Sequence, residues 1–197
     1  MSSTPIAASS LATQIDAAAH DIEARLIAWR RDFHSHPELG NREFRTAAIV
    51  ADHLRALGFD EVRTGVAHTG VVGLLKGALP GPVVALRADM DGLPVKEATG
   101  VPYASTAIVK DMAGKDWPAM HACAHDSHVT ALLGAARILV SLRDRWTGTL
   151  VLVAVRQMRA FDGVDLDGLA RPAQADDAVA GDGVAALAEV EAHAGGQ

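Results

Sequence analysis

The arrangement of apolar segments along the chain restricts the folds that it can adopt. Three runs rich in β-branched residues lie at 61–67, 70–75 and 82–87, with glycine and proline between them, and a fourth lies at 149–155. Short apolar runs of this kind are typical of buried strands. Because helical segments precede and separate them, the sequence predicts an α/β fold in which helices flank the sheet and cover both of its faces.

Three segments carry apolar residues at helical spacing. The first, at 11–34, is expected to end before Pro37, because the residue before a proline disfavours the helical conformation. The second is expected to begin at Asn41 as its N-cap and to end at Gly58, since helices often end with a glycine. The third follows residues 121–128 and is apolar on nearly all sides. A polar connection is expected at 96–115.

The residues after Val155 differ in composition from the rest of the chain. Residues 156–197 hold 8 of the 24 acidic side chains but only 3 of the 18 basic ones, and few of them are large and apolar. Such a segment buries little surface, so we expect it to be poorly ordered. The chain therefore divides into an N-terminal arm with the start of the first helix at 1–20, a main α/β domain at 21–155, and an acidic tail rich in alanine, glycine and aspartate at 156–197.

Charge and hydropathy exclude several classes of partner. The net charge is −6 and the chain has no cluster of lysine and arginine, which argues against nucleic acid. No stretch approaches the roughly 18 continuous apolar residues that a membrane span requires, and the N-terminus lacks the features of a secretory signal. The single cysteine, Cys123, excludes an internal disulfide. These features predict a cytoplasmic protein with neither a membrane nor a nucleic-acid partner.

The strongest chemical signal is the stretch HACAHDSH at 121–128, which places three imidazoles, a thiol and a carboxylate within eight residues. Thiolate and imidazole are preferred ligands of zinc. Cys123 and His125 point the same way on an extended segment, so they could bind one metal ion or one each of a pair. Asp126 could cap the following helix or orient an imidazole. The alternative is a free buried cysteine beside surface histidines, but the density of ligands favours metal binding.

Two carboxylates, Asp89 and Asp91, directly follow the third predicted strand. In α/β sheets, functional groups gather outside the carboxyl ends of the strands. The pair therefore has the placement of catalytic acids or of groups that orient metal ligands, although solvated aspartates are also common at strand ends. The cysteine–histidine stretch further along the chain favours the functional interpretation.

Other candidate groups have plainer explanations. His34 and His36 lie at the end of the first predicted helix, where an imidazole can bond the last carbonyl groups, so we expect structural capping. Glu189, Glu191 and His193 alternate in the tail and resemble a metal site only by chance.

Three segments resemble a known family in their order and spacing. They are RRDFHSHPELGNREFRTA, VVALRADMDGLPVKEATGVPY and MHACAHDSHVTALLGAARIL. Together they resemble the metal-dependent amidohydrolases, which include hippurate hydrolase, N-acyl-amino-acid amidohydrolases and indole-acetyl-amino-acid hydrolases, within the aminoacylase and zinc carboxypeptidase superfamily. The resemblance extends from about residue 22 to Ala154 and identifies residues 21–155 as part of a zinc-peptidase-like catalytic domain.

The resemblance implies hydrolysis of the amide bond of a small N-acyl amino acid at a site of two divalent metals, such as zinc, manganese or cobalt. It implies that Cys123 and His125 are metal ligands. It also implies a catalytic-site acid at Asp89, with Asp91 as the alternative because the motif aligns in either register. A homo-oligomer is a further possibility.

The sequence departs from the family pattern within the 121–128 motif and again after the last predicted strand. Ala124 replaces the glycine of the HACGHD motif, and Ser127 replaces the usual small residue before the last histidine, His128. After the last predicted strand the family continues with QPAEE, whose glutamates supply a general base and a metal ligand, whereas this chain has no adjacent pair of glutamates. The later histidine ligands and the rest of the sheet are missing as well. We therefore expect an incomplete, truncated or frame-shifted domain with impaired activity.

Two alternatives to an active hydrolase remain open. The chain could be a non-catalytic remnant that binds metal weakly or acts as an interaction module. It could also be a redox or metal-storage protein that uses Cys123, although such proteins normally carry a second cysteine.

Overall fold

The computed structural model describes residues 10–156, and its main elements confirm the predicted α/β fold. Of the predicted N-terminal arm and helix start at 1–20, residues 1–9 lie outside the described residues, and so does the predicted poorly ordered tail at 156–197 except for Arg156. The elements are α1 (Leu11–Ser35), α2 (Phe44–Ala56), β1 (Glu61–Val66), β2 (Gly70–Lys76), β3 (Leu79–Asp89), β4 (Ile108–Lys110), β5 (Asp116–Pro118), α3 (His125–Ser141), a short 3-10 helix η1 (Arg143–Arg145) and β6 (Thr147–Val155).

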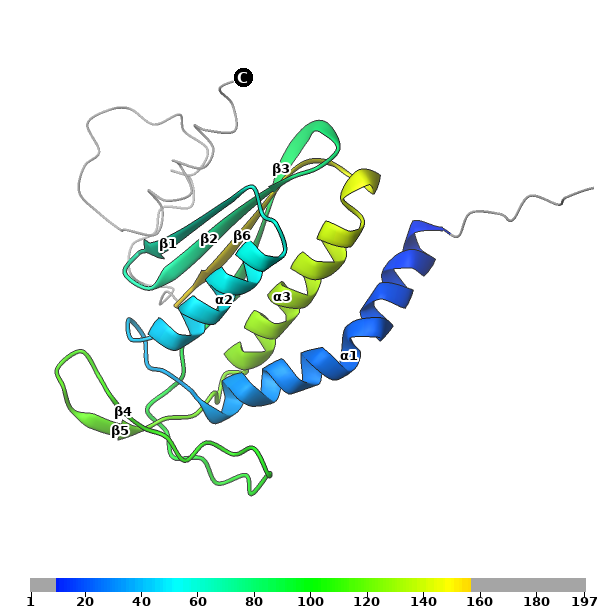
Figure 1. The fold of residues 1–197 in the computed structure, drawn as a ribbon. Coiled ribbons are helices and arrows are strands. Elements are labelled where there is room, and N and C mark those ends of the chain that lie inside the picture. Colours follow the sequence, from blue (N-terminus) through cyan, green and yellow to red (C-terminus); the bar gives the residue numbers. More distant parts are fainter. Residues whose placement is uncertain (1–9, 157–197) are drawn as a thin grey trace, which may run out of the picture.

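A mixed four-stranded sheet forms the centre of the fold, with the strand order β1-β2-β6-β3 (Figure 1). β2 pairs antiparallel with both β1 and β6, whereas β3 and β6 are parallel and are connected through α3. In the register of this parallel pair, Asp89 lies opposite Val155. Asp89 therefore stands at the edge of the sheet where the carboxyl ends of β3 and β6 meet, as the position of the motif predicted.

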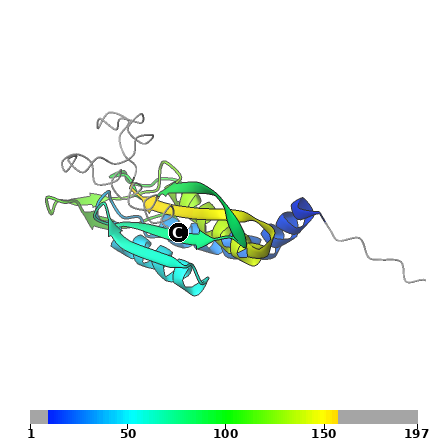
Figure 2. The same cartoon turned by 90° about the horizontal axis from the view of Figure 1, so that it is seen from above.

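Within residues 10–156 the helices form a layer on one face of the sheet (Figure 1, Figure 2). α2 packs on β1 and β2, α3 packs on β3 and β6, and α1 packs against α3. The helices α1 and α3 approach closely at Gly134, where a Cβ atom would lie 2.9 Å from a methyl carbon of Leu26. The main core lies between these helices and the sheet, around Phe33, Leu54, Leu133 and Leu152.

The expected cover of helices on both faces is therefore seen on one face only, as far as the structure describes the chain. A second apolar cluster on the opposite face consists of Val72, Leu74, Val151 and Val153. These residues alternate with core residues along β2 and β6, so the two strands are apolar on both sides. That two-sided pattern is typical of strands buried between two layers, although the prediction of helices on both faces came from the alternation of strands and helices along the chain.

The start of α2 differs from the prediction. The helix begins at Phe44 rather than after Asn41, and Asn41 adopts a left-handed conformation with φ of 63° in the preceding turn. The carboxylate of Glu38 accepts hydrogen bonds from the backbone nitrogens of Arg45 at 2.9 Å and Thr46 at 2.8 Å. Glu38 thus performs the capping role from outside the helix. The other end is as predicted, because Gly58 follows the helix with φ of 79°.

The predicted polar connection at 96–115 contains β4, which belongs to a small two-stranded element that the sequence did not indicate. β4 and β5 pair antiparallel, with Val109 opposite Trp117, apart from the main sheet. Strands of three residues are too short to produce a readable apolar pattern. Among the helices described, none combines the length and apolar character needed to cross a membrane.

Candidate metal centre

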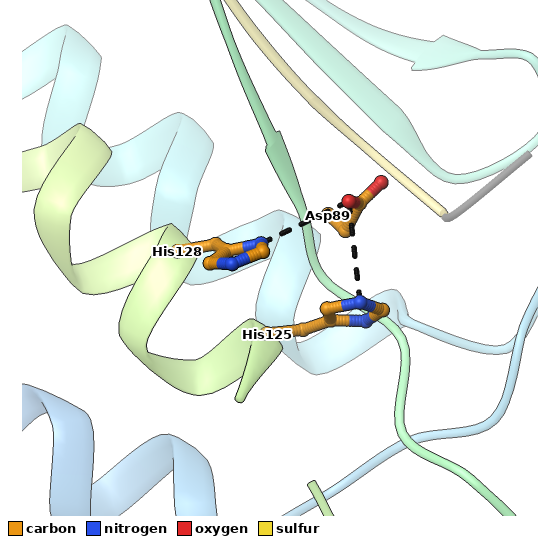
Figure 3. Close-up of side chains that lie close together, drawn as sticks. All are labelled: Asp89, His125 and His128. Atoms are coloured by element: carbon orange, nitrogen blue, oxygen red, sulfur yellow. Dashed lines mark ion pairs between the residues drawn. The ribbon is translucent and has the colours of Figure 1, made fainter. Parts of the chain in front are cut away.

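Three potential metal ligands meet where the end of β3 faces the start of α3. Asp89 is the last residue of β3, and His125 and His128 lie in the first turn of α3. The Oδ2 atom of Asp89 lies 3.9 Å from His125 Nε2 and 3.8 Å from His128 Nδ1. Figure 3 shows both rings turned toward this carboxylate. His125 is buried, whereas about half of the His128 side chain is exposed, so the group opens toward solvent.

The spacing of these atoms suits a shared cation better than direct hydrogen bonds. Separations of 3.8 and 3.9 Å exceed normal hydrogen-bond lengths. Zinc binds nitrogen and oxygen at about 2.0–2.2 Å, which places neighbouring ligands of a tetrahedral site about 3.4 Å apart. The ligand atoms of Asp89, His125 and His128 all lie within 4.8 Å of one another. The two separations from Asp89 to the imidazoles therefore come within about 0.5 Å of those in a tetrahedral metal site.

Asp91 fixes the tautomer of His125. The Nδ1 atom of His125 lies 2.8 Å from the carbonyl oxygen of Asp91 and 3.2 Å from its Oδ1 atom. A carbonyl oxygen only accepts, so Nδ1 carries the proton and Nε2 keeps its lone pair. Metal-binding histidines usually donate their second nitrogen to a carboxylate or carbonyl group in this way. Of the two predicted acids, Asp89 thus faces the imidazoles and Asp91 holds one of them in place.

Arg87 holds the other oxygen of Asp89. Its Nη2 atom forms an ion pair with Asp89 Oδ1 at 2.6 Å and donates a hydrogen bond to the carbonyl oxygen of Arg156 at 3.1 Å. This contact leaves Oδ2 facing His125 and His128. The orientation of the carboxylate is therefore set by a neighbour on the same strand.

Of the predicted site residues, the structure brings Asp89, Asp91 and His125 together. Cys123 lies outside the group of potential ligands formed by Asp89, His125 and His128. Cys123 is a free, exposed thiol in the turn before α3. His128 was seen only as one member of the histidine cluster. Its role depends on the helix beginning at His125, because residues three apart then lie on the same helix face. That spacing was the signal available in the sequence.

The turn into α3 contains two unusual features. Ala124 adopts a left-handed conformation with φ of 61°, which explains why a glycine suits this position. His121 is buried, and neither of its ring nitrogens has a hydrogen-bond partner among the described residues. Burial lowers the pKa of His121 to about 4, although the nearby Asp126 carboxylate acts in the opposite direction. His121 is therefore a neutral imidazole at pH 7.

The expectation of helix capping fits one of the two histidines at the end of α1. The Nδ1 atom of His36 donates to the carbonyl oxygen of Asp32 at 2.7 Å, as a capping residue does. His34 instead points inward and contacts the carboxylates of Asp126 and Glu97. For His34 the capping prediction was wrong, because its partners are distant in sequence.

A groove lies beside His128 between β3 and α3. Its volume is about 360 Å³ and its lining is largely apolar. The lining residues are Leu86, Arg87, His128, Ala131, Leu132 and Ala135. The candidate centre therefore adjoins a space that suits an apolar group.

Known proteins are similar to this chain in sequence and in fold. Residues 85–157 match Peptidase family M20/M25/M40. Thermostable carboxypeptidase 1 of Saccharolobus solfataricus is 46% identical over 134 residues, which are 68% of this chain and 32% of the relative. N-acetyl-L-cysteine deacetylase of Bacillus subtilis is 42% identical over 132 residues, which are 67% of this chain and 29% of the relative.

A solved structure agrees with these relatives. The YXEP protein of Bacillus subtilis, described as a dinuclear metal-binding peptidase of the M20 family, superimposes with a TM-score of 0.60 at 35% identity. The match covers 68% of this chain and 35% of that protein. The chain thus spans about a third of the length of the relatives it matches. The chain is therefore similar to the N-terminal part of peptidases and amidohydrolases of Peptidase family M20/M25/M40.

Proposed function

We propose that this chain contributes a divalent-metal centre to the hydrolysis of the amide bond of N-acyl amino acids. The observation that carries the proposal is the convergence of His125 Nε2 and His128 Nδ1 on Asp89 Oδ2. The relatives support the substrate class, since one of them is named as a deacetylase of an N-acetyl amino acid. When bound, a divalent metal polarises a carbonyl group and lowers the pKa of a coordinated water.

His125 is the residue common to both possible ligand sets. The structure supports Asp89 and His128 as its partners, and the family resemblance supports Cys123. A centre of two metals accommodates both sets, with zinc, manganese or cobalt as the candidate ions. Asp91 keeps the proton on His125 Nδ1, and Arg87 keeps Asp89 Oδ2 turned toward the imidazoles.

The groove beside His128 is the natural place for the apolar part of the acyl group. Its walls come from the exposed side of β3 and from one face of α3, and Arg87 stands at its polar end. An aromatic or aliphatic acyl chain placed there lies next to the candidate ligands.

We also propose that the 197-residue polypeptide alone is a poor catalyst. The family's general base lies in a pair of adjacent glutamates, and the sequence contains no such pair. General-base catalysis typically contributes about 10²–10⁴-fold to rate. This feature favours the alternative function of a metal-binding but non-catalytic module. A cytoplasmic location and a homo-oligomer stay predictions.

Paramagnetic relaxation by manganese tests the proposal with the polypeptide as it is. We expect the manganese-loaded chain to broaden the proton resonances of hippurate, and His125→Ala to remove the effect. His20→Ala is the matched control, because His20 is highly exposed on α1. Equal broadening by His125→Ala, or none by the unmodified chain, would contradict the proposed site. Turnover of hippurate at about 1–10³ per second would contradict the proposed impairment but not the proposed metal site.

A further inference from the structure

Three segments far apart in the sequence meet around His34, in the last turn of α1. The imidazole is buried, and each ring nitrogen faces a different carboxylate. Nδ1 lies 2.8 Å from Asp126 Oδ2, and Nε2 lies 3.0 Å from Glu97 Oε1. His34 therefore joins the end of α1 to the loop after β3 and to the first turn of α3.

Polar side chains form the contacts of this buried cluster. Each ring nitrogen of His34 lies within hydrogen-bond distance of a carboxylate oxygen, which can accept from it. Arg30 donates from Nε to the same Asp126 oxygen at 2.9 Å and from Nη1 to the hydroxyl of Tyr103 at 3.2 Å. The side chains of Asp126 and Glu97 have no exposed surface. His34 and Arg30 thus contact two buried carboxyl groups.

Asp126 connects this cluster to the candidate metal centre. It directly follows His125 in the sequence, and its carbonyl oxygen accepts from the hydroxyl of Thr130 at 2.7 Å. No side chain caps the N-terminus of α3, because the capping position is Ala124. The hydrogen bonds of Asp126 to His34 and Arg30, together with the hydrogen bond of His125 to Asp91, are therefore side-chain contacts that fix the first turn.

We infer that His34 is a positioning residue, which holds Asp126 and with it the turn that directs His125 and His128 toward Asp89. The inference rests on the proposed metal centre. The contacts of His34 are with Asp126 and Glu97, not with the atoms of Asp89, His125 and His128 that face the candidate metal position. Residues that orient metal ligands through hydrogen bonds, without touching the metal, typically lower metal affinity by about 10–100-fold when they are replaced. A purely structural ion cluster would instead stabilise the fold and leave metal affinity unchanged.

Calorimetric titration with zinc separates these two roles. In His34→Gln both donor hydrogens are on one nitrogen, so they cannot take the two separate positions of Nδ1 and Nε2 that face the carboxylates. We expect zinc to bind this variant about 10–100-fold more weakly than the unmodified chain, at a temperature where circular dichroism shows both to be folded. His36→Gln is the matched control, since His36 lies at the same helix end with its ring half exposed. An equal affinity of both variants, with only the melting temperature of His34→Gln lowered, would overturn the inference.

Amide exchange without metal gives a second readout, which is independent of the proposed function. The backbone nitrogens of Ser127 and His128 donate to the carbonyl oxygen of Ala124 at 2.9 and 3.2 Å. We expect His34→Gln to accelerate exchange at these two amides while exchange in β2 stays unchanged. If the unmodified chain binds no zinc, the proposed metal centre fails and these amides alone decide the inference. Unchanged exchange would then overturn it.

Glu97→Gln provides a milder variant in case His34→Gln does not fold. The amide oxygen still accepts from His34, but the negative charge is lost. We expect zinc affinity to fall by about threefold, the effect of one weakened hydrogen bond. If Glu97→Gln changes neither zinc affinity nor amide exchange at Ser127 and His128, the inference is wrong.

Discussion

The Nδ1–H group of His125 donates a hydrogen bond of 2.8 Å to the carbonyl oxygen of Asp91, and its Nε2 atom consequently faces Asp89. A backbone acceptor holds the ring at the end of β3 without any contribution from a bound ion. The imidazole is therefore preorganised to bind metal, because neither its tautomer nor its orientation has to change. The predictions below follow from this arrangement and from the turn that leads into it.

Replacing Asp89 with asparagine tests which ligands belong to the centre. The substitution keeps the size of the side chain but removes the negative charge that faces His125 and His128. We expect Asp89→Asn to weaken zinc binding by about 10–100-fold, measured by calorimetry. Asp116→Asn is the control, since Asp116 forms an exposed ion pair with Lys110 on the separate two-stranded sheet. Unchanged binding in Asp89→Asn, together with loss of binding in Cys123→Ser, would assign the ion to the cysteine set instead.

Ala124→Gly should stabilise the protein. A non-glycine residue in the left-handed region costs about 1–2 kcal/mol, while glycine costs about 0.5–1 kcal/mol through the entropy of the unfolded chain. The net expectation is a gain of about 0.5 kcal/mol in the free energy of unfolding, measured with urea. Ala122→Gly should be destabilising, because Ala122 has no positive φ to relieve. Equal losses in the two variants would show that Ala124 is unstrained.

Stability should fall as the pH falls from about 6.5 toward about 4, and His121 should account for part of that loss. Burial lowers the pKa of His121 to about 4 in the folded protein, against about 6.5 in the unfolded chain. The unfolded chain therefore binds more protons between these values, and acid favours unfolding. From pH 7 to pH 5 we expect His121 to remove about 2 kcal/mol. Metal-free His121→Leu should lose less over the same range, and an identical pH dependence would contradict this origin.

The outer edge of β3 should mediate self-association. Within the described residues β3 pairs only with β6, and Val83 and Val84 on this strand are 44% and 52% exposed. An exposed apolar edge strand is a template for pairing with another chain, and a lysine placed there opposes it. Sedimentation of the unmodified chain should show dimers that Val84→Lys reduces, whereas Ile108→Lys on β4 should not. A monomer at every concentration would count against the edge as an interface.

Local patterns were sufficient to predict the parts of the structure that depend on neighbouring residues. The apolar runs located β2, β3 and β6, and the position of Asp89 after a strand placed it correctly at the edge of the sheet. His125 was predicted as a candidate ligand because its motif is compact in the sequence. These features depend on a single strand or turn, so no knowledge of the tertiary contacts was needed.

Contacts between distant residues were the parts that the sequence could not predict. His34 and Asp126 are separated by 92 positions, so their hydrogen bond leaves no local pattern. Asn41 has the chemistry of an N-cap, but the carboxylate of Glu38 reaches the first turn of α2 and makes that cap unnecessary. In both cases the helix is held by a side chain from another part of the chain, so the sequence of the helix alone does not reveal the contact.

X-ray absorption at the zinc edge tests the central claim, which is that His125 anchors a metal centre with protein ligands. For the zinc-loaded chain we predict scattering from imidazole rings, with nitrogen and oxygen at about 2.0–2.2 Å and, where Cys123 takes part, sulfur at about 2.3 Å. In His125→Ala the imidazole scattering should weaken and the zinc should be retained poorly. A shell of oxygen atoms alone, or a spectrum unchanged by His125→Ala, would contradict the account.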